Sequence, residues 1–256
     1  MFSVPPFFKD IFQHLPSALL DLISWKEMIY EVGILSNRIL TNKGATQVSN
    51  ELKGLNIDHF ELVSQLEDST PNPDWGKKIL MIYFYQIMNN SQLFLDFRLK
   101  LFSQSENKIQ WSPGGLWAQM DRNFISGIRK VYRGYYFNDD ALFIKGMLES
   151  GLVKSEWSEE KKNEVIEVFK KHFSNGRNER ITFTMEDFQA SFAKIFQTLV
   201  KNKIQLDKNF LYLGIMLVTL YLSLDELAGE YDVSSIFKDC VDQSLKKQNN
   251  SLNFSK

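Results

Sequence analysis

The sequence has little cysteine, proline, glycine or net charge, and each shortage narrows what the protein can be. Its single cysteine, Cys240, excludes an internal disulfide and any cysteine-based zinc site. The formal net charge is −1, so no basic excess points to nucleic acid as a partner. With 13 glycines and 6 prolines in 256 residues, few positions interrupt the helical periods, which predicts a mainly α fold. The 21 phenylalanines predict a core rich in aromatic rings.

Long uncharged runs are also scarce. One stretch, from Phe210 to Leu224, contains no charged residue. A membrane-spanning helix needs about 20 apolar residues, so this shorter run favours a buried core helix over a spanning or interfacial one. The N-terminal "MFSVPPFFKDIF" lacks the basic stretch and apolar run of a signal peptide. We therefore expect a cytoplasmic protein, with peripheral membrane contact as the alternative.

Helical periods fill most of the chain and suggest one domain in three parts. Residues 1–75 predict a helical N-terminal extension that packs on or beside the core. Residues 76–245 predict the helical core, which includes the nearly all-apolar "KKILMIYFYQIMNN" and a helix beginning at Thr184. Residues 246–256 are polar and predict a frayed tail.

One region departs from the helical period. "LFLDFRLKLF" alternates Phe97, Leu99 and Leu101 with Arg98 and Lys100, which is the two-residue period of a strand. "SQSENK" follows as a turn, and "IQW" would pair back. The sequence thus predicts one small β-hairpin near residues 94–113.

The hairpin leads into "SPGG", where Pro113, Gly114 and Gly115 form a glycine-rich turn before a helix. Enzymes often bind a metal or a phosphate at such a turn, yet the next carboxylate is Asp121. Two interpretations stay open: a metal-binding turn that has lost its ligand, or a plain tight turn. The three histidines are far apart in the sequence, and we expect structural roles for them and no metal.

Residues 77–153 resemble the C-terminal lobe of the UbiB/AarF-type atypical kinases. That family has a helix, then Asp-Pro-His-Pro-Gly-Asn, a strand and Asp-Phe-Gly. Asp96 falls on the first aspartate, as a remnant of the catalytic loop, and Leu101 stands where the metal-binding asparagine would be. Gly115 matches the last residue of Asp-Phe-Gly, which puts Pro113 in place of the metal-binding aspartate. The resemblance implies a kinase-like C-lobe with degenerate metal positions.

What the resemblance implies about activity follows from those losses. Kinases hold magnesium with the aspartate and the asparagine that are replaced here. Leu101 offers no side-chain oxygen, and Pro113 offers neither a carboxylate nor an N–H. The sequence of residues 1–75 also predicts no strand carrying the phosphate-anchoring lysine. We therefore expect no cofactor, with ATP and magnesium bound only if the kinase interpretation survives.

Three functions remain at this point. The first is a non-catalytic, pseudokinase-like protein that binds an unknown protein partner or a ligand and is linked to quinone or lipid metabolism. The second is a helical protein that holds an apolar small molecule such as a lipid or isoprenoid, for which the Phe-rich composition and two apolar helices argue. The third and least favoured is an active ATP-dependent phosphotransferase that relies on Asp96.

Overall fold

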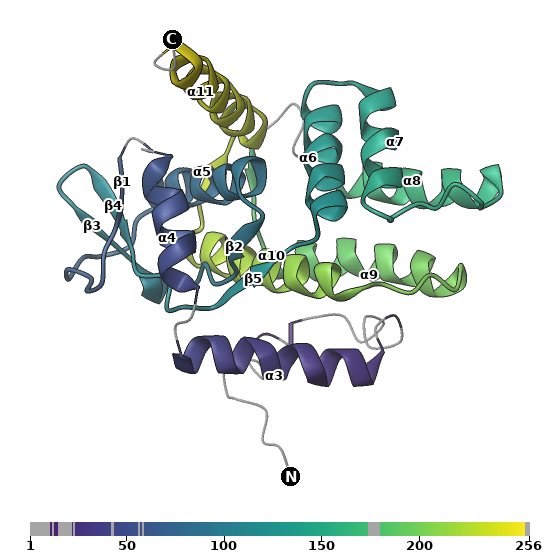
Figure 1. The fold of residues 1–256 in the computed structure, drawn as a ribbon, viewed down its shortest axis with the longest axis horizontal. Coiled ribbons are helices and arrows are strands. Elements are labelled where there is room, and N and C mark those ends of the chain that lie inside the picture. Colours follow the sequence, from purple (N-terminus) through teal and green to yellow (C-terminus); the bar gives the residue numbers. More distant parts are fainter. Residues whose placement is uncertain are drawn as a thin grey trace.

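The computed structural model describes residues 24–41, 44–55, 59–173 and 180–253, together with Ile11, Gln13, His14, Leu22 and Ile57; side chains are described as far as Ser244. Within these residues the fold is mainly α, as predicted (Figure 1). The helices are α3 (Trp25–Thr41), α4 (Ala45–Gly54), α5 (Asp74–Asn89), α6 (Arg122–Tyr136), α7 (Asp140–Glu149), α8 (Glu159–Phe173), α9 (Met185–Lys201), α10 (Lys208–Leu227) and α11 (Val233–Asn253).

Helices α5 and α10 occupy the middle of the molecule, between α11 and α3 (Figure 1). Helix α5 packs against both α10 and α11. Of the described helices, α10 alone is long and apolar enough to cross a membrane, with a mean hydropathy of 1.6 over its most apolar window. In that window 56% of the residues are buried inside the protein, as expected of a core helix.

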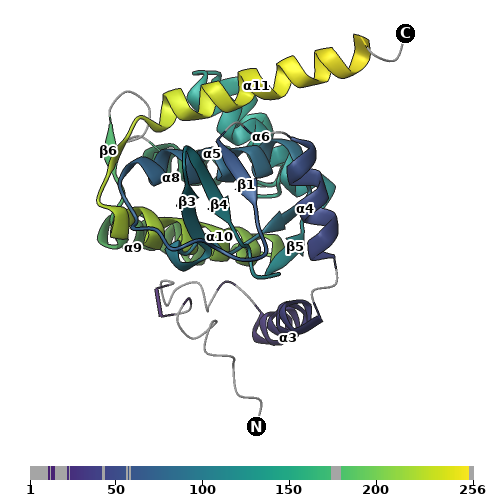
Figure 2. The same cartoon turned by 90° about the vertical axis from the view of Figure 1, so that its left-hand side faces the viewer.

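In the part of the chain that the structure describes, three small sheets accompany the helices. In the largest, β1 (Phe60–Leu62) runs parallel to β4 (Lys108–Trp111), which pairs antiparallel with β3 (Phe102–Ser105). Figure 2 shows these three strands side by side, with α4 next to β1. The other sheets pair β2 (Gln92–Phe94) with β5 (Trp117–Gln119) and β6 (Ile181–Thr182) with β7 (Glu230–Tyr231), both antiparallel.

The predicted hairpin exists as β3 and β4, but its first strand was placed wrongly. Residues 95–98 belong to no ladder, and Leu99–Leu101 form a turn of 3₁₀-helix, η1. The reason lies in α10. The Thr219 hydroxyl donates to the Leu95 carbonyl and accepts from the Phe97 N–H, and the Ser223 hydroxyl donates to the Phe97 carbonyl. Side chains of α10 thus satisfy the backbone groups that a paired strand would otherwise satisfy.

The described part of residues 1–75 joins the core and is not purely helical. It contains β1, which the sequence analysis missed, in addition to α3 and α4. On α4, Val48 and Leu52 are completely buried in the same hydrophobic core as α5 and α10. Arg38 of α3 donates to the Trp117 carbonyl of β5. At the other end, α11 reaches Asn253, beyond the start of the predicted frayed tail at residue 246; side chains there lie outside the described residues.

Candidate functional site

The residues singled out around the hairpin come together in two adjoining segments. The Ser112 N–H donates to the Leu101 carbonyl over 2.9 Å, and the Leu95 N–H donates to the Leu116 carbonyl over 2.9 Å. Gly114 and Gly115 have φ angles of 58° and 76°, which belong to the left-handed region that favours glycine. The "SPGG" segment is therefore a tight turn that lies beside the loop carrying Asp96.

Asp96 is buried, with 4% of its surface exposed, and it is held by Arg98. One carboxylate oxygen accepts from Arg98 Nη2 at 2.6 Å, and the other accepts from Arg98 Nε at 2.9 Å. The Arg98 backbone N–H adds a bond of 3.1 Å. A bidentate pair with a guanidinium is among the strongest hydrogen-bonded arrangements of a carboxylate. Arg98 therefore competes with any metal ion for both carboxylate oxygens of Asp96.

The neighbouring residues Leu101 and Pro113 give Asp96 no further side chain that could bind a metal. Leu101 and Pro113 carry no side-chain oxygen, and the described residues contain no group of three or more His, Cys, Asp or Glu side chains placed to hold a metal ion. The Leu101 side chain instead lies close to the turn. A Cβ atom added to Gly114 would be 3.9 Å from the Leu101 Cδ2 atom. These residues form a tight turn, and the carboxylate beside it, on Asp96, is already paired with Arg98.

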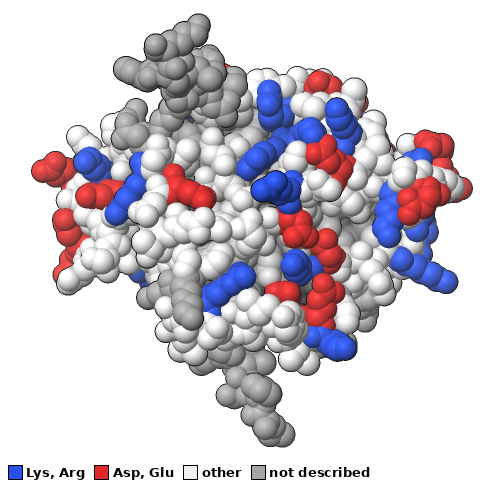
Figure 3. All heavy atoms as spheres, in the orientation of Figure 1, with Lys and Arg blue, Asp and Glu red and all other residues white. Residues whose placement is uncertain are grey.

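On the face of the molecule shown in Figure 3, the described residues form no cluster of cations of the kind that binds a polyanion. On the face shown in Figure 3, lysines and arginines alternate with aspartates and glutamates. Such interspersed charges agree with the formal net charge of −1. Nucleic-acid sites instead gather cations into a patch or stripe.

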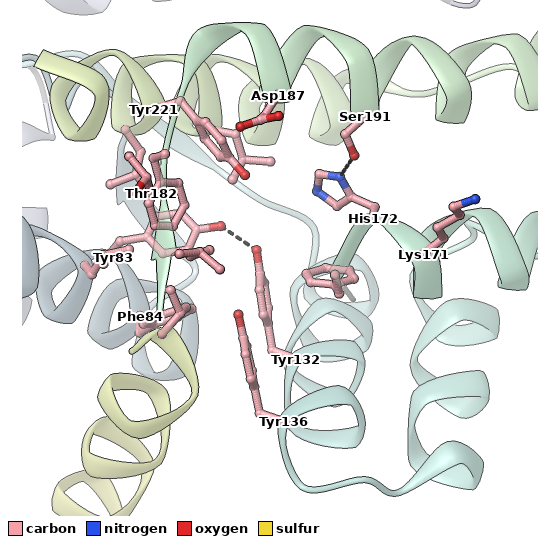
Figure 4. Close-up of a pocket in the computed structure, with 17 residues that line it drawn as sticks. Tyr83, Phe84, Tyr132, Tyr136, Lys171, His172, Thr182, Asp187, Ser191 and Tyr221 are labelled. Atoms are coloured by element: carbon pink, nitrogen blue, oxygen red, sulfur yellow. Dashed lines mark hydrogen bonds between the residues drawn. The ribbon is translucent and has the colours of Figure 1, made fainter. Parts of the chain in front are cut away.

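A second candidate site is a cavity of about 480 Å³ that lies between α5, α6, α8, α9 and α10, beside β6 and the start of α11 (Figure 4). We call it the tyrosine pocket, because Tyr83, Tyr132, Tyr136 and Tyr221 all line it. Its mouth is marked by the exposed lining residues, which are Lys171, Thr182 and Asp187. The remaining lining residues are Leu80, Phe84, His172, Phe173, Ile181, Phe183, Ser191, Leu217, Leu220 and Val233.

The tyrosines form a connected group. The Tyr83 and Tyr132 hydroxyls share a hydrogen bond of 2.6 Å, and the rings of Tyr132 and Tyr136 lie nearly parallel, 5° apart, with centroids 6.3 Å from each other. Figure 4 shows Tyr132 and Tyr136 standing side by side on α6, one turn apart. Burial raises the pKa of Tyr132 to about 12. Burial, reinforced by neighbouring tyrosines, also raises the pKa of Tyr83, Tyr136 and Tyr221, so all four hydroxyls stay protonated at neutral pH.

His172 borders the same pocket. Its Nδ1 is hydrogen-bonded to the Ser191 hydroxyl, and its ring lies between those of Phe173 and Phe192. Burial lowers the pKa of the imidazole to about 4, so it is neutral at physiological pH. A neutral histidine adds a polar, uncharged group to the wall.

Sequence reasoning missed this pocket. Its residues come from six helices and a two-residue strand, and no local motif joins them. The available signals were indirect: the Phe-rich composition and the apolar character of α5 and α10. No protein-family model and no curated protein matches the chain.

Proposed function

We propose that this protein is a non-catalytic binding protein that takes an apolar small molecule into the tyrosine pocket. The observation that carries the proposal is the cavity itself, at about 480 Å³. Ligand pockets typically enclose about 300–1,000 Å³ and combine apolar and aromatic walls with a few convergent polar groups. Rings of phenylalanine and tyrosine supply the walls here, and hydroxyls and one neutral imidazole supply the polar groups.

The hairpin region supports the non-catalytic part of the proposal. Asp96 is engaged by Arg98, and Leu101 and Pro113 stand where a kinase would place metal ligands if the resemblance holds. Phosphoryl transfer relies on metal-bound phosphates beside a positioned nucleophile. An active phosphotransferase would need Arg98 to leave Asp96 and a metal to bind without the two missing ligands.

Kinship to the UbiB/AarF-type kinases is part of the proposal at the level of architecture. A helix (α5), a loop with Asp96, a hairpin (β3 and β4), a glycine turn and another helix (α6) follow one another in the order that the resemblance implies. A role in quinone or lipid metabolism and a cytoplasmic location, with peripheral membrane contact as the alternative, remain predictions that rest on the sequence.

The proposal is tested with a neutral apolar fluorophore and with nucleotide. N-phenyl-1-naphthylamine, whose emission rises in apolar surroundings, should bind the protein saturably. ATP with magnesium should leave the melting temperature unchanged, whereas a nucleotide bound at 100 times its Kd would add about 2.7 kcal/mol of stability. A clear rise in melting temperature with ATP and magnesium would support the kinase interpretation instead.

A matched pair of variants locates the binding. Leu217 lines the pocket and is partly buried, so Leu217→Trp should fill the cavity and abolish the fluorescence increase. Leu40→Trp adds the same ring at a position on α3 that is 84% exposed, and it should bind the fluorophore like the wild type. Equal loss in both variants, or no saturable signal in the wild type, would contradict the proposal.

A further inference from the structure

The tyrosine pocket holds hydroxyl groups that have no partner. Among the described residues, neither the Tyr136 nor the Tyr221 hydroxyl makes a hydrogen bond, although both rings line the cavity. Tyr136 is 5% exposed, and Tyr221 is partly buried between the rings of Phe183 and Phe188. Neither oxygen is among the fully buried, unpaired polar atoms of the described residues, so both hydroxyls are accessible and can donate a hydrogen bond to a molecule inside the cavity.

The Tyr83–Tyr132 pair adds a third donor. Two hydroxyls that share one hydrogen bond commit only one of their two hydrogens to it. The other hydrogen, on whichever oxygen accepts, remains for a third group. Three O–H hydrogens at the cavity wall therefore lack an acceptor among the described residues.

We propose that the pocket selects a neutral, flat molecule with an exposed acceptor oxygen, such as a ketone carbonyl, which Tyr136 and Tyr221 bind through their hydroxyls. This inference rests on the proposed function and names the class of ligand. Flatness is argued from the aromatic walls, because the nearly parallel Tyr132 and Tyr136 rings line the cavity together with Tyr221 and Phe183. Aromatic rings contact a planar ligand over a large area at little entropic cost.

The groups around the pocket favour a ligand that accepts hydrogen bonds and carries no negative charge. Burial raises the pKa of both hydroxyls, so they stay protonated and act as donors. The exposed carboxylate of Asp187 stands at the mouth near Tyr221, where it opposes an anion. The Lys171 side chain points away from the tyrosines (Figure 4). An anion would thus enter without a facing cation, at a high desolvation cost.

Three matched probes separate these properties. 9-Fluorenone is a flat neutral ketone, fluorene has the same rings without the oxygen, and 9-fluorenone-4-carboxylate adds a negative charge. Their affinities are measured by displacement of N-phenyl-1-naphthylamine from the wild-type protein. Fluorenone should bind about 3- to 10-fold more tightly than fluorene, as expected from the net contribution of one to two hydrogen bonds. The carboxylate should bind more weakly than fluorenone.

Variants then assign the preference to the hydroxyls. Tyr136→Phe and Tyr221→Phe remove the oxygens and keep the rings, and each should reduce the advantage of fluorenone over fluorene. The double variant should lose most of the preference and keep only what the free O–H of the Tyr83–Tyr132 pair contributes. Tyr30→Phe makes the same change on α3, where Tyr30 is 66% exposed, and should retain the wild-type ratio.

The outcomes separate the two proposals. If the wild type binds fluorene as tightly as fluorenone, or the carboxylate more tightly than either, the inference about ligand class is wrong while the apolar pocket stands. If the double variant keeps the full fluorenone preference, the assignment to Tyr136 and Tyr221 is wrong. If no probe displaces the fluorophore, the proposed pocket itself is wrong. The wild-type comparison decides the ligand class even if a variant does not fold.

Discussion

A single residue, Arg98, decides what Asp96 does. The carboxylate lies in the loop between β2 and η1, and the guanidinium two positions later pairs with both of its oxygens. An alternating pattern places Asp96 and Arg98 on the same face of a strand, on the solvent side, and so predicts an exposed pair. Asp96 is instead buried, in residues 95–98, which belong to no strand and lead into η1.

His172 also acts at the residue scale, through its protonation state. Burial lowers the pKa of the imidazole from 6.5 to about 4. The unfolded chain therefore takes up a proton at a higher pH than the folded protein does, and protonation favours unfolding. The stability that this residue contributes is complete above pH 6.5 and is lost as the pH falls toward 4. We expect a loss of up to about 3 kcal/mol, at 1.36 kcal/mol per pKa unit.

Urea unfolding at pH 7 and pH 4.5 measures this contribution. His172→Phe cannot take up the proton, so its free energy of unfolding should fall by about 2–3 kcal/mol less than that of the wild type over this range. His59→Asn is the control, since His59 is exposed and has a φ of 61°, which asparagine tolerates. An identical loss in the wild type and in His172→Phe would show that the imidazole does not titrate in this way.

At the scale of elements, α6 and α7 pack so closely that their backbones touch. A Cβ on Gly146 of α7 would lie 2.5 Å from the Val131 nitrogen and 2.6 Å from the Gly127 carbonyl oxygen, both on α6. Backbone atoms of a helix cannot yield as a flexible side chain can. Gly146→Ala should therefore push the helices apart and lower the free energy of unfolding by about 3 kcal/mol or more, as measured by urea titration.

The control substitution should change the free energy of unfolding in the opposite direction. Gly33 lies within α3, and a Cβ there would meet nothing within 4 Å. Gly33→Ala should raise the free energy of unfolding by about 0.5–1 kcal/mol, because alanine is the better helix former. Destabilisation in both variants would trace the effect to the loss of glycine itself, not to the contact between α6 and α7.

A helix or strand could be predicted from the sequence where the residues that stabilise it are close together in the chain. The start of α9 was visible because Thr184 caps the helix by accepting from the Asp187 N–H, a pattern confined to one short segment. Strands β1, β2 and β5 were not visible, since each is too short for a two-residue period to stand out. Such strands form because distant segments pair with them, as β1 does with β4.

At the scale of the whole molecule, the same contrast explains the two candidate sites. Asp96, Leu101 and Pro113 were singled out through a resemblance within one short stretch of the sequence, and their role stays a prediction. The tyrosine pocket could not, because its walls run from Leu80 on α5 to Val233 on α11. Those helices come together only in the packed structure, so no spacing of residues along the sequence predicts the pocket.

Packing also predicts that the chain folds as a unit. Strand β1 borders β4, and hydrogen bonds join α3 to later elements: the Tyr212 hydroxyl donates to Glu31, and Arg38 donates to the Trp117 carbonyl. A fragment of residues 76–256 would expose the apolar surface that α3 and α4 cover and would leave one edge of β4 unpaired. We expect the full chain to unfold in one transition, with tryptophan fluorescence and helical circular dichroism changing at the same urea concentration. The fragment should aggregate or unfold without cooperativity. A soluble fragment with a sharp transition of its own would show that residues 76–256 form an independent domain.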